Sequence, residues 1–190
     1  MNLNTLNNLT QLAADIKRWG RELGFAEIGI TDTDLTSAEA KHQAWIKKGF
    51  HGDMDYMAKH GVKRTRPADL VPNTVRVISA RLDYCPPKAK DSWPVIEDGE
   101  KAFISRYALG RDYHKVMRNK LQKLCDKISA EIADFADNQF ESRVFTDSAP
   151  VLEVALAEKA GLGWRGKHTL LLNKDHGSWF YLGEIYTNLS

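Results

Sequence analysis

The chain has only two cysteines among its 190 residues, Cys85 and Cys125. Two thiols are too few for an iron–sulfur cluster, which typically takes four cysteine ligands. Their wide separation also matches neither a zinc-ligand pattern nor a disulfide framework. The sequence therefore predicts no metal site. Cys125 lies within a helical pattern and is expected in the core, whereas Cys85, beside two prolines, is expected to have no chemical role.

Long apolar runs and a large excess of one charge are missing too. No window approaches the roughly 20 apolar residues of a membrane-spanning helix, and the first residues lack the basic and apolar regions of a signal peptide. The net charge of +2 does not by itself require nucleic acid or an anionic membrane as a partner. With 43% hydrophobic residues, the chain is expected to form one domain, residues 1–190, of a monomeric cytoplasmic protein with no membrane partner.

Two common phosphate-binding motifs are absent as well. The sequence has no G-x-G-x-x-G and no G-x-x-x-x-G-K-[ST], so a dinucleotide Rossmann site or a P-loop would lack its phosphate cradle. The glycine-rich segment GLGWRGK at 161–167 matches such a loop only weakly. It is better explained as a helix stop followed by a tight turn that presents Lys167, with Trp164 packed beneath it.

Hydrophobic periodicity predicts the helices. Apolar residues recur every three or four positions over residues 6–23 and 112–135, which indicates two long amphipathic helices. Another helix is expected from Thr36 or Ser37 to about Lys48. Residues 50–67, which are polar and rich in methionine, are expected to form a site loop.

Alternating and β-branched residues predict the strands. They are expected at 26–31, 74–84 and 102–108, and a closing hairpin is expected to join 168–173 to 178–185. The proline-rich segment 85–94 is expected to be an irregular excursion. Alternating helices and strands favour an α/β sandwich, and the hairpin adds antiparallel pairing. The predicted fold is therefore a mixed β-sheet flanked by helices.

Asp147 is the best candidate for a reactive group, because it lies where a β-like run ends and a helical pattern begins. Ser148 is expected to cap that helix, with Pro150 in its first turn. Polar groups at the carboxyl end of a strand often line ligand crevices in α/β sheets. Asp is also a frequent helix cap, so the residues alone leave both interpretations of Asp147 open, and the cap is the commoner of the two.

The middle of the chain is locally cationic. Residues 101–127 carry eight basic side chains against two acidic ones. Such a segment either faces phosphates, on a cofactor tail or on RNA, or forms a solvated helix face. Spacing alone does not decide between these alternatives.

Several longer motifs occur in one order along the chain. They are WGRELGF at 19–25, IGITD at 28–32, HGDMDYMAKH at 51–60, R-P-x-x-L-x-P at 66–72, SRYALGRDYHKVMRNKL at 105–121, FTDSAPVLEVALAEKAGLGWRGK at 145–167 and WFYLGEI at 179–185. Together they resemble the epoxyqueuosine reductase family over essentially the whole chain.

The resemblance implies the last step of queuosine formation in tRNA, in which cobalamin removes the epoxide oxygen of epoxyqueuosine and an external donor supplies the electrons. It implies a nitroreductase-like cobalamin-binding domain with Asp147 as the catalytic proton donor. The cobalamin contacts that it implies are Arg64, Ser105, Arg106, Asp147, Lys167, Leu171, Asn173 and Leu182. With tRNA as the partner, the candidates to face its phosphates are Arg111, Lys115, Arg118 and Lys123.

One departure from the family pattern is clear. Members continue beyond the L-G-E strand into a ferredoxin-like region with cysteine clusters, whereas this chain ends at Ser190. The chain is therefore expected to be the amino-terminal, cobalamin-binding portion, with iron–sulfur clusters only in the remainder. The alternatives are a cobalamin carrier without catalysis, a flavin nitroreductase-like oxidoreductase, and an RNA-binding scaffold. The scaffold is the weakest alternative, because only Tyr107 and Tyr113 interleave with the basic residues for base stacking.

Overall fold

A four-stranded sheet organises the chain in the computed structural model, which describes residues 3–85, 88–133 and 140–189. The strands, in the order in which they lie side by side, are β1 (Glu27–Thr31), β2 (Arg76–Asp83), β6 (Phe180–Thr187) and β3 (Ser142–Phe145). The α/β class with helices on both sides is confirmed. Every pairing in this sheet is antiparallel, so the parallel pairing of a mixed sheet is not found among the described strands. The reason lies partly in the connection from β1 to β2, which returns the chain to the end of the sheet that it left.

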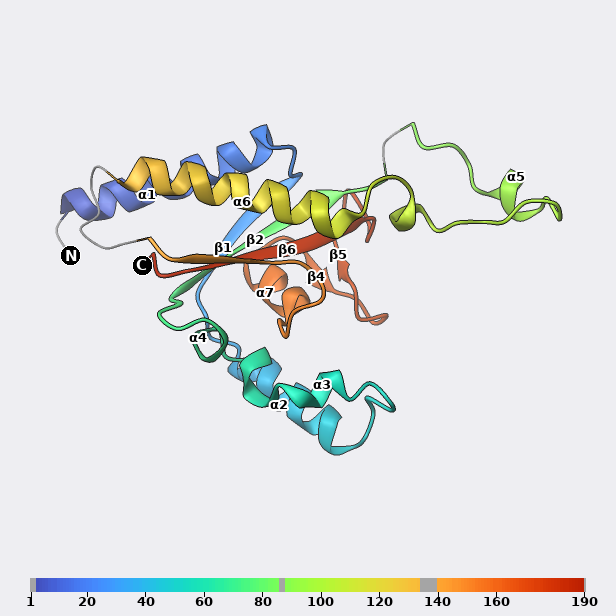
Figure 1. Ribbon diagram of the computed structural model, residues 1–190, viewed down its shortest axis with the longest axis horizontal. Coiled ribbons are helices and arrows are strands. Elements are labelled where there is room, and N and C mark those ends of the chain that lie inside the picture. Colours follow the sequence, from blue (N-terminus) through green and yellow to red (C-terminus); the bar gives the residue numbers. More distant parts are fainter. Residues whose placement is uncertain (1–2, 86–87, 134–139, 190) are drawn as a thin grey trace.

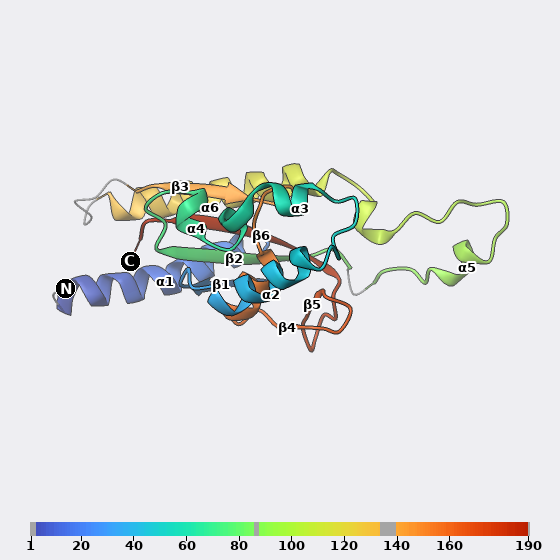
Figure 2. The same ribbon diagram turned by 90° about the horizontal axis from the view of Figure 1, so that it is seen from below.

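Two long helices, α1 (Leu3–Glu22) and α6 (Tyr113–Ile132), lie side by side over one face of the sheet (Figures 1 and 2). Both were predicted from periodicity, and the buried stripe of α6 is the predicted one, with Cys125 in the core as expected. Residues 134–135 of the predicted helix lie outside the described residues. Gly183 of β6 lets α6 approach closely, since a Cβ there would lie 3.0 Å from side-chain carbons of Met117 and Leu121.

The other face is covered by α7 (Glu153–Lys159) and a small two-stranded sheet of β4 (Trp164–Arg165) and β5 (Leu171–Leu172). The predicted hairpin between 168–173 and 178–185 is wrong in its pairing, because β5 pairs with β4 while β6 pairs with β2 and β3. One isolated bridge, Asn173 to Gly177, closes the turn between them. Trp164 is half exposed rather than packed beneath Lys167, because the segment 164–172 is itself a hairpin at the edge of the molecule.

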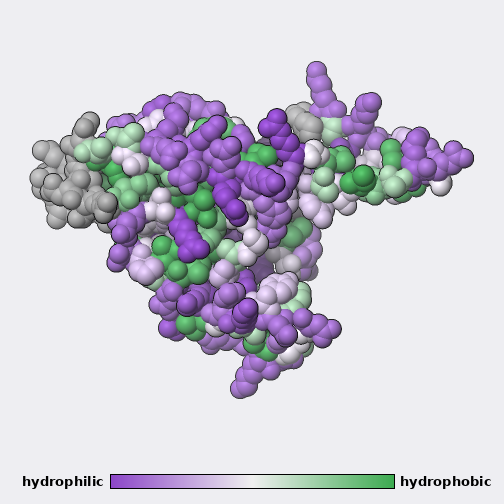
Figure 3. Space-filling view, viewed as in Figure 1, coloured by the Kyte–Doolittle hydropathy of each residue, from purple (hydrophilic) through white to green (hydrophobic). Residues whose placement is uncertain are grey.

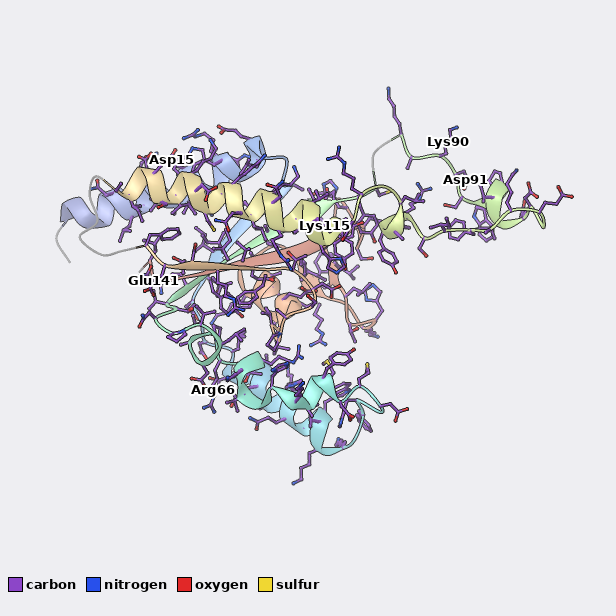
Figure 4. All side chains as sticks on the ribbon, in the orientation of Figure 1. Asp15, Arg66, Lys90, Asp91, Lys115 and Glu141 are labelled. Atoms are coloured by element: carbon purple, nitrogen blue, oxygen red, sulfur yellow. The ribbon has the colours of Figure 1, made fainter. Side chains whose placement is uncertain are left out.

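A helical lobe connects β1 to β2 and comprises α2 (Thr36–Lys47), α3 (Tyr56–Lys59), η1 (Gly61–Arg64) and α4 (Pro67–Leu70). The helix predicted from Thr36 is therefore confirmed. Glu39 of α2 holds the lobe together: its carboxylate accepts bonds from the Arg66 guanidinium at 2.8 and 3.0 Å and from the Thr65 hydroxyl at 2.8 Å. The pKa of Glu39 falls to about 2, chiefly through the Arg66 bond. Figure 4 shows Arg66 on this lobe.

An arm formed by residues 88–110 projects from the end of the sheet (Figure 1) and carries the short helices α5 (Trp93–Ile96) and η2 (Arg106–Ala108). It is longer than the predicted excursion at 85–94. Residues 86–87 of the predicted excursion lie outside the described residues. The strand predicted at 102–108 is wrong: these residues lie on the arm, where Phe103 and Ile104 are exposed. Their alternation therefore reflects apolar side chains on a projecting segment, whose surface mixes apolar and polar patches in Figure 3.

Candidate active site

A pocket of about 210 Å³ lies at the edge of the sheet where β3 stops. The β3–β6 ladder ends at the pair Phe145–Glu184, whereas β6 begins four residues earlier, at Phe180. The pocket lies along this first half of β6. Its lining comes from the residue after β2, the arm, α6, the turn after β3, α7, β5 with its preceding residue, and β6 with its preceding turn: Tyr84, Tyr107, Tyr113, Asp147, Glu153, Val154, Leu170, Leu171, Ser178, Phe180, Tyr181 and Leu182.

Asp147 leaves β3 in an unusual backbone conformation. Its φ is +56°, in the left-handed region that only Gly, Asn and Asp visit with any ease. The Ser148 amide donates to the Thr146 carbonyl at 2.7 Å, which makes a three-residue turn around Asp147. Strained turns of this kind concentrate at functional sites.

Neither Asp147 nor Ser148 caps a helix. Helix α7 begins only at Glu153, and its N-cap position is Leu152, which forms no side-chain capping bond. The predicted helix start at Pro150 is therefore wrong. The physical reason is a second three-residue turn, in which the Val151 amide donates to Ala149 at 2.8 Å and the chain stays non-helical. Of the two interpretations left open by the sequence, the structure favours an acid at a pocket.

Two side chains at the start of α6 contact the Asp147 carboxylate. The Tyr113 hydroxyl donates to Asp147 Oδ2 at 2.5 Å, and His114 Nε2 lies 3.0 Å from the same oxygen. The other ring nitrogen of His114 faces Asp112 Oδ1 at 3.0 Å. Asp112 in turn is the N-cap of α6 and accepts the His114 amide, so the helix start fixes the position of both side chains.

The pKa values of these partners shift in directions that suit this network. Burial tends to lower the pKa of His114, but its bonds to Asp112 and Asp147 outweigh that effect and raise the pKa above its usual value. The pKa of Tyr113 is also raised, first by burial and then by the bond to Asp147. Tyr113 is therefore a hydrogen-bond donor at neutral pH, and the two carboxylates on either side of His114 stabilise its charged form.

An aromatic wall forms one side of the pocket. The Tyr113 and Tyr181 rings stack at 4.1 Å with 3° between their planes, and Tyr84 lies 4.6 Å beyond Tyr181. The reasoning from sequence missed Tyr84 and Tyr181. The position of Tyr84 at the end of a predicted strand could have indicated it, but the stacking brings together three segments far apart in sequence.

Two further carboxyl groups were also missed, Glu153 and Glu184. Glu153 lines the pocket, and burial followed by the charge of Asp147 raises its pKa to about 7. Glu184 on β6 is fully buried, and burial followed by the charge of Glu153 raises its pKa well above the usual range. No sequence signal marked Glu184, because it sits in an apolar strand where a charge is not expected.

The residues implied as cofactor contacts fall into three groups. Asp147, Leu171 and Leu182 come together in the pocket. Lys167, which is exposed, and Asn173 belong to the adjoining segment 164–173, where Asn173 donates to the Leu162 carbonyl at 3.3 Å. Ser105 and Arg106 lie on the arm immediately before Tyr107, and Arg106 donates to the Lys90 carbonyl and, at 3.0 Å, to the Ser92 hydroxyl.

Arg64 does not line this pocket. It is buried in the helical lobe, where its guanidinium donates to the Tyr56 carbonyl at 3.1 Å. Next to it lies a second cavity of about 220 Å³, lined by residues of α2, α3 and η1 and by Thr65. In this structure Arg64 therefore contacts the backbone of the helical lobe and does not line the pocket that contains Asp147.

The cationic candidates lie on the outer surface of α6 and just before it. Arg111, Lys115, Arg118 and Lys123 are all exposed. Lys115 and Arg118 are three residues apart on one helix face, and Lys115 is one residue from His114 (Figure 4). One end of this exposed face is therefore next to His114, which contacts the pocket residue Asp147.

Within the described residues, no group of three or more His, Cys, Asp or Glu side chains is placed to hold a metal ion. The same part of the chain contains no helix that is both long and apolar enough to cross a bilayer.

Comparison with known proteins shows which proteins this chain is similar to. Residues 64–148 match the family model described as epoxyqueuosine reductase QueG, DUF1730. The curated epoxyqueuosine reductase of Burkholderia pseudomallei (strain K96243) is 58% identical over 196 aligned residues, which cover 95% of this chain and 47% of that protein. The chain is related to the epoxyqueuosine reductases. It spans about half the length of the curated relatives that it matches.

Solved structures of epoxyqueuosine reductases share the fold. The enzyme of Streptococcus thermophilus matches with a TM-score of 0.72 at 26% identity, over 94% of this chain and 46% of that one. A second structure, of an epoxyqueuosine reductase with a tRNA-Tyr epoxyqueuosine-modified tRNA stem loop, matches with a TM-score of 0.72 at 24% identity, over 94% of this chain and 46% of that one. At this identity the second match establishes the fold alone.

Proposed function

We propose that this chain is the cobalamin- and substrate-binding domain of an oxidoreductase that reduces epoxyqueuosine to queuosine in tRNA, with Asp147 as its proton donor. The observation that carries the proposal is the placement of Asp147 in a strained turn at the pocket, in contact with Tyr113 and His114. The relatedness to epoxyqueuosine reductases supports the choice of substrate.

The pocket fits one face of a flat macrocycle. Its volume of about 210 Å³ is below the roughly 300–1,000 Å³ typical of enclosed ligand pockets, so a corrin would rest on it instead of filling it. Its lining of leucines, Phe180 and stacked tyrosines suits the apolar face of such a ring. A one-sided site also agrees with a chain that covers about half of its relatives, whose remainder would cover the other face.

Cobalamin, when bound, would supply the electrons that open the epoxide, and it would receive them from an external donor. In this chain, Leu171 and Leu182 would lie against the ring. Lys167, Asn173, Ser105 and Arg106 would make contacts from the hairpin and the arm. Arg64 would take part only through the lobe, because it does not line the pocket.

Asp147 would deliver a proton to the epoxide oxygen as negative charge develops there. Both of its contacts engage Oδ2, so Oδ1 is the oxygen that faces the substrate in this scheme. After the transfer, Tyr113 and His114 donate to the carboxylate and stabilise it.

The exposed basic face of α6 would bind the tRNA backbone. Arg111, Lys115, Arg118 and Lys123 could each neutralise a phosphate, and such contacts dominate affinity for nucleic acid. Their closeness to His114 would place a nucleoside of the bound tRNA over the pocket. A tRNA-modifying domain of this kind would act in the cytoplasm, as a single domain over residues 1–190.

The test combines cofactor binding with turnover. Cobalamin is titrated into the purified chain and its absorbance spectrum is recorded; we expect saturable binding by the wild type and by Asp147→Asn. With a chemical reductant and tRNA carrying epoxyqueuosine, only the wild type should form queuosine, detected by mass spectrometry of the nucleosides. Asp175→Asn, an exposed acid in the turn 174–177, is the matched control and should behave as wild type.

Two results would contradict the proposal. If the chain takes up no cobalamin, it does not contain the proposed cobalamin-binding site. A wild-type chain that binds cobalamin and tRNA but forms no queuosine under reducing conditions would instead support the carrier alternative.

A further inference from the structure

Behind Asp147 lies a pair of carboxyl groups that the proposed chemistry has not yet used. Glu153 lines the pocket, and its carboxyl group accepts a hydrogen bond from the main-chain amide of Asp147. Glu184 is the strand partner of Phe145, two residues before Asp147. The two glutamates interact electrostatically, because the charge of Glu153 raises the pKa of Glu184. Three carboxyl groups, those of Glu184, Glu153 and Asp147, are therefore electrostatically linked between the core of the sheet and the pocket.

Glu184 has no exposure to solvent, and neither of its carboxyl oxygens has a hydrogen-bond partner among the described residues. Three buried hydroxyls nearby in the fold, those of Ser79, Thr146 and Tyr186, likewise have no partner in this part of the chain. Ser79 is directly opposite Glu184 on β2, so both side chains are on the same face of the sheet. An isolated carboxylate in such a place would cost several kcal/mol, so Glu184 is held in its neutral, protonated form.

The charged and titratable neighbours do not remove this proton. The charge of Asp147 raises the pKa of Glu153, and the charge of Glu153 raises the pKa of Tyr113 on α6. The charge of Glu153 on α7 raises the pKa of Glu184, and the charge of Glu184 raises the pKa of Tyr186 on the same strand. The cations on the adjoining strands have other contacts: Arg81 of β2 pairs at 3.6 Å with Glu27 and with Asp83, Arg76 of β2 donates to the Val75 carbonyl, and Arg143 of β3 lies over the Phe145 ring. Like charges next to one another and burial therefore both favour protonated glutamates.

The stoichiometry of the proposed reaction gives this pair a use, and the following inference rests on that proposed function. Reducing an epoxide to an alkene breaks two C–O bonds, forms the C=C π bond and releases the oxygen as water. The external electron donor supplies two electrons, and the water takes up two protons. Asp147 carries only one proton at a time, so it must be reprotonated within each turnover.

We propose that Glu153 returns a proton to Asp147 after the first transfer, while Glu184 stays protonated behind it. Both Glu153 and Asp147 then regain a proton from solvent through the pocket before the next turnover, so the two protons consumed come from solvent. In this sequence the Asp147 O–H bond breaks as the substrate O–H bond forms. The Glu153 proton then passes to the Asp147 carboxylate, which delivers the second proton as water leaves. Glu153 acts through Asp147 and has no contact with the reacting atoms.

A titration of the full chain tests the shared proton without reference to activity. Glutamate carboxyl carbons are labelled with ¹³C and followed by NMR from pH 4 to 9. We expect one carboxyl with a midpoint near 7 that disappears in Glu153→Gln, and a second with a midpoint well above the ordinary glutamate value that disappears in Glu184→Gln. Asp147→Asn should lower the first midpoint, because it removes a negative charge beside Glu153. If every glutamate ionises near the ordinary value of about 4.3, the proposal is overturned.

A single-turnover assay with cobalamin, chemical reductant and epoxyqueuosine-containing tRNA tests the supply step. The wild-type rate should fall as the pH rises past 7, because Glu153 loses its proton. Glu153→Gln should be about 10²-fold slower, the lower end of the range for a positioned acid–base group, and should lose this pH dependence. Glu153→Asp should restore part of both, while cobalamin binding is unchanged in all variants.

The two proposals fail in different ways. If the wild type forms queuosine and Glu153→Gln keeps the same rate and pH profile, the supply step is wrong and the proposed function stands. If the wild type forms no queuosine, the function and the supply step both fall, whereas the titration still decides whether the buried proton exists.

Discussion

The pH dependence of folding stability gives a direct test of the Glu153 environment. In the folded protein the pKa of Glu153 is about 7, whereas an unfolded chain restores its ordinary value of 4.5. Between these values the unfolded state has released the proton and the folded state still holds it. Since stability falls with pH wherever the folded state binds more protons, Glu153 should destabilise the protein progressively from about pH 4.5 to 7.

The size of the effect follows from the same two values. Each unit of pKa corresponds to about 1.4 kcal/mol, so a rise from 4.5 to about 7 corresponds to a loss of about 3 kcal/mol that is complete just above pH 7. A glutamine has nearly the shape of a protonated glutamate and cannot ionise. Glu153→Gln should therefore match the wild type near pH 4.5 and exceed its free energy of unfolding by about 3 kcal/mol at pH 8.

Urea denaturation at half-unit steps from pH 4.5 to 8.5 measures this difference, with both proteins in the same buffers and salt. Glu131→Gln, at an exposed position of α6, is the matched control and should stay within about 0.5 kcal/mol of the wild type throughout. A constant difference between Glu153→Gln and wild type over the whole range would refute the reasoning, because it would mean that Glu153 ionises alike in the folded and unfolded chains.

Three further predictions address other parts of the molecule. Tyr113→Phe removes the hydroxyl that donates to Asp147 at 2.5 Å, and we expect queuosine formation to fall about 10-fold or more while cobalamin binding, followed by absorbance, is unchanged. Reversing two exposed charges of α6, in Lys115→Glu with Arg118→Glu, should weaken tRNA binding and flatten its dependence on salt; an unchanged salt slope in a filter-binding assay would show that the face is only solvated. Gly183→Val places carbon atoms against α6 and should lower the free energy of unfolding by about 1–3 kcal/mol, whereas unaltered urea stability would mean that the close approach of α6 is not tight.

The parts of the fold that the sequence predicted are those with a long, regular pattern. Helices α1 and α6 each run for 20 residues, which is long enough for the 3.6-residue period to be unambiguous. The strands β1 and β2 were predicted for a related reason, since β1 is rich in β-branched residues and β2 is an apolar run that is buried over most of its length.

Short elements were predicted wrongly because tertiary contacts override their local sequence pattern. Residues 102–108 have the alternation of a strand, yet they lie on the arm, and only the course of the chain from β2 to α6 decides this. The two-residue strands β4 and β5 pair with each other although 168–173 looked like the partner of β6. A pattern of two residues carries no register, so the pairing was not readable from the sequence.

The candidate site shows the same division. Asp147 could be chosen from its place at the end of a β-like run, but its left-handed backbone could not, because Asp-Ser-Ala-Pro is equally a good helix start. In the sequence, Tyr113 and His114 belonged to the first turn of a predicted helix, and Tyr113 was also a candidate for base stacking. Their role as partners of Asp147 follows from the meeting of α6 with the end of β3, a contact between segments 33 and 34 residues apart.

The location of the pocket follows from the unequal lengths of two paired strands. β6 has eight residues and β2 pairs with all of them, whereas β3 has four and pairs only with the second half of β6. The edge that β3 leaves open would expose the backbone and side chains of the first half of β6. Here α6, α7 and β5 surround that edge, and the turn at Asp147 carries the acid into the space where β3 would have continued. Extending β3 by even two residues would place Asp147 in the ladder, remove the left-handed turn and fill the pocket. The early end of β3 is therefore the structural feature on which the site depends.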